Sequence, residues 1–353
     1  MTDKKETLTA VLAGLAIGAV AVLLVLLGNP ANMGFCIACF VRDIAGALGL
    51  HRAAAVQYIR PEIIGLVLGS MLLALARKEW QPKGGSAPMT RFVLGFFVMI
   101  GCLMFLGCPF RMVLRLAGGD GNALFGFAGF AAGILCGVFF LNRGYTLRRT
   151  YRLPATEGAV LPAILLALLA LLAAAPGFLL FSQEGPGSKH APLLVSLAAG
   201  LAVGALAQRT RLCMVGGIRD FVLFREKKLL LAFAAIFAAA FVCNLLTGNF
   251  HPGFAGQPVA HTDALWNALG MLLAGFGCVL LGGCPLRQLV LAGEGNADSA
   301  VTVLGLLVGA AFAHNFGLAS SADGPTAAGK AAVLIGLAAV TAIACANTFR
   351  KGE

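Results

Sequence analysis

Apolar runs recur along the whole chain, and each is long enough to cross a lipid bilayer. A membrane-spanning helix needs about 20 apolar residues, because the hydrocarbon core is about 30 Å thick. Hydrophobic residues make up 59% of this 353-residue sequence, charged residues make up only 12%, and the mean hydropathy is +0.90. Soluble globular domains do not have such a composition. We therefore expect ten spans, near residues 8–28, 58–76, 91–107, 121–142, 158–181, 191–208, 229–247, 264–283, 297–318 and 327–346.

The same polar motifs occur twice in this apolar background, about half a chain length apart. A cysteine followed six residues later by Arg-Asp occurs at two places: Cys36, Arg42 and Asp43, then Cys213, Arg219 and Asp220. A Gly-Cys-Pro-x-Arg motif with another cysteine six residues ahead also occurs twice: Cys102, Cys108, Pro109 and Arg111, then Cys278, Cys284, Pro285 and Arg287. The shifts are 213 − 36 = 177 and 284 − 108 = 176 residues, so we interpret the whole chain as a duplication.

Five spans in each copy predict the topology of an all-α polytopic membrane protein. Because five is odd, the second copy enters the membrane from the opposite side, and the two copies form inverted repeats. We expect a first membrane repeat over residues 1–181, with its motifs facing outward, and a second over residues 182–353, with its motifs facing inward.

The basic residues give the orientation of the chain. The first apolar run follows Lys4 and Lys5 but lacks a small-x-small cleavage pattern, so we expect a retained span rather than a secretory signal. With the N-terminus in the cytoplasm, most of the 26 Lys and Arg residues fall in inner segments. Both termini are therefore predicted to be cytoplasmic. The net charge of +11 reflects this bias, and we expect no nucleic-acid partner.

The four motif segments are too apolar for ordinary loops and too short to cross the membrane. We interpret them as re-entrant half-helices, since such backbone is tolerated at membrane depth only inside protein or along a cavity. Pro109 and Pro285 suit the first helical position, which places Cys108 and Cys284 at the caps. The free N–H groups at a helix start attract anions and make a thiol more reactive. Arg111 and Arg287 would add positive charge at the same places.

Repetition separates the candidate binding cysteines from packing cysteines. We expect substrate binding or gating by the repeated thiols: Cys36, Cys108, Cys213 and Cys284, with Cys102 and Cys278 as weaker candidates. Unrepeated cysteines within spans are more typical of packing. We interpret the Arg-Asp pairs, Arg42 with Asp43 and Arg219 with Asp220, as structural ion pairs, and direct contact with substrate is the alternative.

Cys39 is the one motif thiol that the second copy lacks, because Gly216 stands at its position. The Cys36-x-x-Cys39 spacing leaves a redox or metal role and a disulfide open. The sequence offers no second cysteine pair nearby that would complete a four-sulfur site. We therefore expect no metal and no cofactor, and we keep Cys39 as a candidate binding thiol.

The duplicated Cys-x5-Arg-Asp and Gly-Cys-Pro-x-Arg segments resemble the YeeE/YedE family of sulfur-compound transporters. The FCIACFVRD wording is closer to its YedE branch, which is regarded as transporting selenium. The resemblance implies a bacterial inner-membrane permease in which half-helices meet at a waist and central cysteines pass a sulfur-containing anion. Carried over by motif, the gating thiols would be Cys36, Cys108 and Cys284, and internal symmetry adds Cys213.

The leading hypothesis is thus a transporter, and not an enzyme, for a selenium compound or a thiosulfate-like reduced sulfur anion. Its partners would be the small substrate, membrane lipid and a cytoplasmic carrier protein for sulfur or selenium. A membrane thiol protein that relays electrons or sulfur is the alternative, and a structural or sensor subunit of a larger complex is a third. A GxxxxGK[ST] motif is absent from the sequence, which excludes direct ATP drive within this chain.

Overall fold

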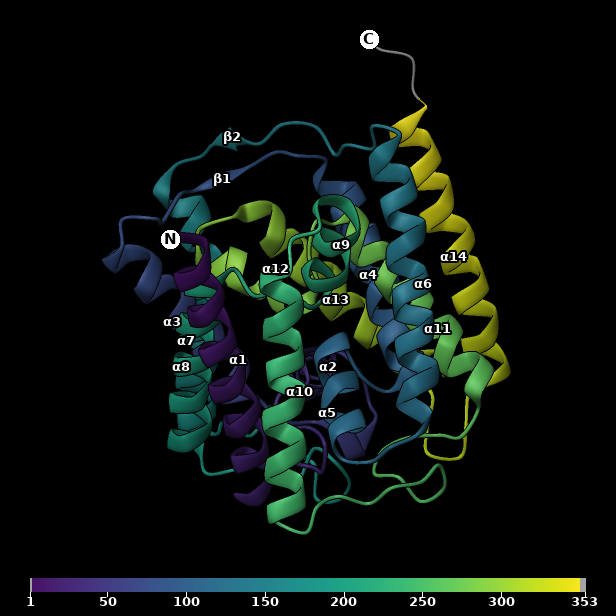
Figure 1. The fold of residues 1–353 in the computed structure, drawn as a ribbon. Helices are drawn as coiled ribbons and strands as arrows, with labels where there is room; N and C mark the ends of the chain where they lie inside the picture. Colours follow the sequence, from purple (N-terminus) through teal and green to yellow (C-terminus); the bar gives the residue numbers. More distant parts are fainter. Residues whose placement is uncertain (1, 350–353) are drawn as a thin grey trace.

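Ten long helices dominate the computed structural model, which describes residues 2–349 (Figure 1). They are α1 (Thr2–Leu26), α3 (Pro61–Ala76), α4 (Pro88–Phe105), α6 (Asn122–Asn142), α7 (Ala155–Ala174), α8 (Leu193–Thr210), α10 (Lys228–Leu246), α11 (Ala264–Leu280), α13 (Ala297–Asn315) and α14 (Ala327–Thr348). In the described residues, ten candidate spans are long and apolar enough to cross a membrane. The prediction of an all-α protein with about ten spans is confirmed.

Four short helices occupy the four motif segments. They are α2 (Ile37–Ala47), α5 (Pro109–Ala117), α9 (Met214–Phe224) and α12 (Pro285–Gly293). The helix order long, short, long, long, short, long, long therefore occurs twice in the described chain. In Figure 1, α2 and α5 lie at one level of the molecule, and α9 and α12 lie at another. The re-entrant placement and the repeats 1–181 and 182–353 stay predictions.

Little regular structure lies outside the helices. A single turn of 3₁₀-helix, η1 (Ala54–Val56), precedes α3, and strands β1 (Lys83–Gly84) and β2 (Tyr151–Arg152) form an antiparallel pair. In Figure 1, these strands lie on the side where α1 begins and α14 ends. We call this side the terminal face.

The long helices pack in pairs drawn from different halves of the chain. α3 packs against α8, α1 against α10, α6 against α11, and α4 against both α11 and α13. Glycines allow the backbones to approach closely, as is typical of membrane helices. A Cβ at Gly69 would lie 2.1 Å from the carbonyl oxygen of Leu201, and a Cβ at Gly129 would lie 1.9 Å from that of Ala268.

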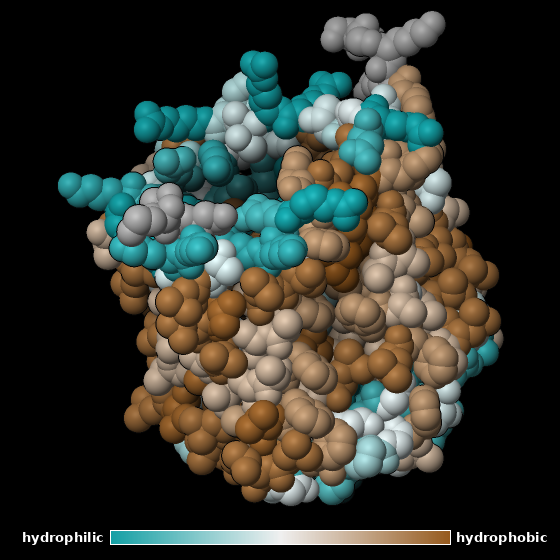
Figure 2. All heavy atoms as spheres, viewed as in Figure 1, coloured by the Kyte–Doolittle hydropathy of each residue, from teal (hydrophilic) through white to brown (hydrophobic). Residues whose placement is uncertain are grey.

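The outer surface matches a membrane environment. In Figure 2, hydrophobic side chains cover the middle of the visible face, and hydrophilic side chains gather at the terminal face and, in smaller number, at the opposite end. Large apolar side chains such as Leu194, Leu246 and Leu265 are exposed on the long helices. Such surface is stable against lipid but not against water. The chain is therefore a multi-pass membrane protein.

The close approach at Gly129 generates a stability prediction. Gly129→Ala would force α6 and α11 apart, and overpacking of this kind costs about 1–3 kcal/mol. We expect a lower midpoint of thermal unfolding in detergent. Gly177→Ala is the matched control, because a Cβ there meets nothing within 4 Å. Equal midpoints for the two variants would contradict this account of the helix interface.

Candidate functional site

Each of the four short helices begins directly after a cysteine. Cys36, Cys108, Cys213 and Cys284 are the N-cap residues of α2, α5, α9 and α12, and all four have extended backbone angles. In α5 and α12, the first helical residue is a proline, which disfavours helical angles at the residue before it. The local sequence thus fixes where these helices start and leaves a thiol at each start.

The cap thiols come together as two pairs. The Cys36 sulfur accepts a hydrogen bond from the backbone N–H of Cys39 at 3.4 Å, and it faces the thiol of Cys108. In the other half, the Cys213 sulfur accepts from the N–H of Gly216 at 3.4 Å. We call Cys36 with Cys108 the first thiol pair.

In the second thiol pair, Cys213 with Cys284, both sulfurs meet the start of the same helix. The Cys284 sulfur accepts from the N–H of Met214 at 3.4 Å, and Met214 is the first residue of α9. The two thiols also face each other. Segments about 70 residues apart in sequence are thereby joined at one point where two helices start. The N–H groups and dipoles at these helix starts stabilise negative charge beside each thiol pair.

The other candidate thiols lie near the pairs. Cys102 on α4 and Cys278 on α11 are fully buried and lie close enough to interact electrostatically. Cys102 is also close enough to the first thiol pair to interact with it electrostatically, and Cys278 is close enough to interact with Cys213. Cys39 donates weakly from its thiol to the carbonyl oxygen of Leu106, at 3.9 Å. Thiols from both halves of the chain therefore lie within electrostatic range of one another.

All ten cysteines are free thiols, and the three that belong to no motif are less buried than the other seven. Cys136 is exposed on α6, and Cys243 and Cys345 are partly buried on α10 and α14. The four cap thiols, by contrast, are at most 3% exposed. Within residues 2–349, no cluster of three His, Cys, Asp or Glu side chains has the arrangement of a metal site.

The two motif arginines are held differently. Arg111 is fully buried, and its guanidinium donates to the carbonyl oxygens of Leu106, Pro258 (3.1 Å), Val259 (3.2 Å) and Asn32 (3.3 Å). Its charge lies near Cys36, but its N–H groups bind the protein backbone. Arg287 is partly exposed and pairs instead with Glu294, with 3.1 Å between nitrogen and oxygen.

The two Arg-Asp motifs form ion pairs, and the first one has a partner that the sequence did not reveal. Arg42 and Asp43 approach to 2.7 Å, and Arg60 reaches the other carboxylate oxygen of Asp43, also at 2.7 Å. All three side chains are at most 3% exposed. Arg219 and Asp220 approach to 2.8 Å but are 22% and 16% exposed.

A second buried ion pair also escaped the sequence analysis. Arg115 and Asp120 approach to 2.6 Å with no exposure, and the Arg115 guanidinium lies over the ring of Phe105. Only the Arg-x3-Arg spacing after Pro109 could have pointed to Arg115, and its equivalent in the second copy is the apolar Leu291. The charges around the first thiol pair are thus sealed inside the protein, whereas those around the second are partly open to solvent.

The buried ion pair at Asp43 generates a prediction with a built-in control. Asp43→Asn would leave Arg42 and Arg60 buried without their counter-charge, a loss typically worth about 3–5 kcal/mol. The repeat-related variant Asp220→Asn removes a partly exposed pair and should cost at most about 1 kcal/mol. We expect a much larger drop in the unfolding midpoint for Asp43→Asn. Similar drops would contradict the difference in burial.

Comparison with known proteins finds a family similarity in the second half of the chain. No curated protein matches the sequence. The family model described as sulphur transport matches residues 209–349, which contain α9 to α14 and the second thiol pair. Over these residues, the chain is similar to the sulphur transport family, the family that its repeated cysteine motifs resemble.

Proposed function

We propose that this membrane protein transports a small selenium or reduced sulfur anion by passing it between the two thiol pairs, without converting it. A selenium species is the favoured cargo, and a thiosulfate-like anion is the second. The observation that carries the proposal is the meeting of two cysteine-capped helix starts at each pair. The family match supports the sulfur class of the cargo.

The chemistry of the pairs suits a soft anion. Helix N-termini attract negative charge, and thiols are weak hydrogen-bond donors that fit polarisable sulfur or selenium atoms. Weak binding at successive sites favours passage, because a cargo held too tightly does not leave. Cys102 and Cys278 would serve as intermediate contacts between the pairs. A hard oxyanion such as sulfate would lack the contact between soft atoms.

An inverted duplication would make the pairs the two mouths of one path. Two findings support residues 1–181 and 182–353 as the repeats: the repeated order of long and short helices, and the packing. When the copies are matched, α1 corresponds to α8 and α3 to α10, so the contact α3–α8 corresponds to the contact α1–α10. In the same way, α4 corresponds to α11 and α6 to α13, so the contact α6–α11 corresponds to the contact α4–α13. By the distribution of basic residues, the terminal face would lie in the cytoplasm of a bacterial inner membrane. A cytoplasmic carrier protein would then deliver or accept the cargo at this face.

Adjacent thiols also favour one alternative, a membrane redox or sulfur-relay protein. Such a protein would form a disulfide or a persulfide within a thiol pair during turnover. The protein can be exposed to cargo, quenched with an alkylating reagent and analysed by mass spectrometry. This measurement distinguishes transport without conversion from relay chemistry. Transport without conversion predicts free thiols at Cys213 and Cys284, whereas relay chemistry predicts a persulfide or mixed disulfide there.

Removing one cap thiol should strongly lower uptake of the cargo. We expect Cys108→Ala or Cys284→Ala to lower uptake of labelled selenium compound in cells by at least about tenfold, the loss that one contact of ~1.4 kcal/mol represents. Cys136→Ala is the control, since this thiol is exposed on the outside of α6. Wild-type uptake in both cap variants would rule out the proposal.

Competition should rank cargoes by their softness. Selenium species and thiosulfate added in excess should reduce uptake of the labelled compound, and sulfate should not, because it offers only hard oxygen atoms. The measurement is the initial uptake rate in whole cells with each competitor. Sulfate competing as well as thiosulfate would contradict a selectivity based on thiols.

A further inference from the structure

One network of partly exposed charges links the second thiol pair to the terminal face. Arg211 binds Glu79 through one nitrogen and Glu294 through another, each at 3.1 Å, and Glu294 also binds Arg287 at 3.1 Å. Gln208 adds a hydrogen bond to Glu79 at 2.8 Å. The network therefore joins the loop after α3, the junction of α8 and α9, and α12.

Arg211 and Glu294 lie on the two segments that carry the thiols of the second pair. Arg211 is the C-cap of α8, with a φ of +58°, and it lies two residues before Cys213. Glu294 is the C-cap of α12, the helix that begins after Cys284. The ion pair between them thus ties the segment leading into one thiol to the helix that carries the other. If this ion pair opens, the segment leading into Cys213 loses one of its links to α12.

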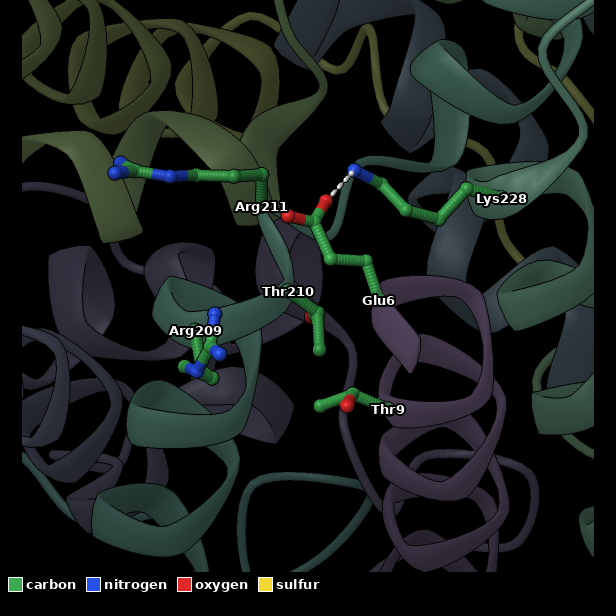
Figure 3. Close-up of a pocket in the computed structure, with 6 residues that line it drawn as sticks. All are labelled: Glu6, Thr9, Arg209, Thr210, Arg211 and Lys228. Atoms are coloured by element: carbon green, nitrogen blue, oxygen red, sulfur yellow. Dashed lines mark hydrogen bonds and ion pairs between the residues drawn. The ribbon is translucent and has the colours of Figure 1, made fainter. Parts of the chain in front are cut away.

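Two cavities flank Arg211, so water and small ions reach both sides of it. One, of about 140 Å³, is lined by Glu6, Thr9, Arg209, Thr210, Arg211 and Lys228 (Figure 3). In this view, the long Arg211 side chain extends away from Glu6 and Lys228, which pair with each other. The other cavity, of about 160 Å³, is lined by Glu79, Gln81, Lys83, Arg211, Glu294 and Asn296. Arg211 forms the wall that the two cavities share.

Among the described residues of the first half, the arrangement has no equivalent. The residue that matches Arg211 by the shift of 177 is Gly34, where a Cβ would lie 1.8 Å from the carbonyl oxygen of Ala21. Asp120, which precedes a Gly-Asn sequence as Glu294 does, is fully buried against Arg115. The Arg211 side chain is 49% exposed and that of Glu294 is 11% exposed. Ion pairs with this exposure are weak and exchange readily with other ions.

We propose that Arg211 is an anion-exchange gate, at which the cargo anion replaces Glu294 and so removes the ion pair that ties the α8–α9 junction to α12. The proposal rests on the transport function and identifies one further binding residue for it. Arg211 keeps an anionic partner before and after the exchange, so no unpaired charge is created. The class of ligand is a small anion, and thiosulfate and selenite are the probes to use.

Thiol accessibility tests the gate without requiring transport. The full-length protein is reconstituted in vesicles, and labelling of Cys213 and Cys284 by a charged, membrane-impermeant maleimide at the terminal face is followed by mass spectrometry. We expect Glu294→Gln and Arg211→Gln to label about two- to fivefold faster than wild type, the factor that fits a partly exposed ion pair. Arg209→Gln, which changes an exposed arginine of the first cavity, should label like wild type.

Salt provides a second readout that needs no variant. Labelling of wild type should accelerate between low ionic strength and about 0.5 M KCl, because the Debye length falls to a few ångströms and weakens the pair. Glu294→Gln should respond much less. A wild type insensitive to salt, or a Glu294→Gln variant that labels at the wild-type rate, would overturn the gate.

Transport kinetics test the exchange itself. With thiosulfate or selenite as cargo, Glu294→Gln should lower KM because the competing carboxylate is gone, and Arg211→Gln should raise it because the binding residue is gone. Opposite shifts are not expected from a purely structural role, so KM values that move in the same direction would contradict the exchange. If the wild type transports neither anion while labelling follows the expected pattern, the transport proposal fails, whereas control of thiol access by the Arg211–Glu294 ion pair stands.

Discussion

The capping of two short helices, α2 and α9, by cysteine sulfur is the interaction on which the rest of the structure depends. A helix start leaves backbone N–H groups without partners, and these groups are costly to bury away from water. Cys36 and Cys213 each satisfy one such N–H within their own helix, and Cys284 reaches across to the start of α9. A sulfur atom is large and accepts only weakly, so the caps hold the helix starts together without matching the strength of an oxygen cap. The same N–H groups therefore stay available to a passing anion.

The long helices form the frame that makes this arrangement stable. Their glycine-lined contacts bring backbones within reach of each other, as between α6 and α11 at Gly129. Buried charges then fix the short helices inside the frame, with Asp43 between two arginines on one side and Arg115 on Asp120 near it. Around the second thiol pair, the charges are more exposed and bind one another through Arg211 and Glu294. The first mouth of the proposed path is thus closed by buried pairs, and the second by a weaker network.

The sequence predicted the spans well because each one is a long apolar run, a signal that depends only on neighbouring residues. It also predicted the positions of the four short helices, because proline and the repeated cysteines mark where they start. It missed Arg60, whose carboxylate partner Asp43 lies 17 residues away, and Arg211, whose partner Glu294 lies 83 residues away. Neither arginine is repeated in the other copy, so the duplication gave no signal for them. The buried state of Arg111 also could not be read from its motif, since three of its acceptors are carbonyl groups from distant loops.

Locating the cargo itself tests the central claim most directly. The measurement is an experimental structure of the full-length protein bound to a selenium-containing anion, with the selenium atom located by its anomalous X-ray scattering. Our account predicts an anomalous peak in contact with the sulfur atoms of one or both thiol pairs, at the helix starts after Cys36, Cys108, Cys213 and Cys284. A selenium atom bound only away from these thiols would contradict it.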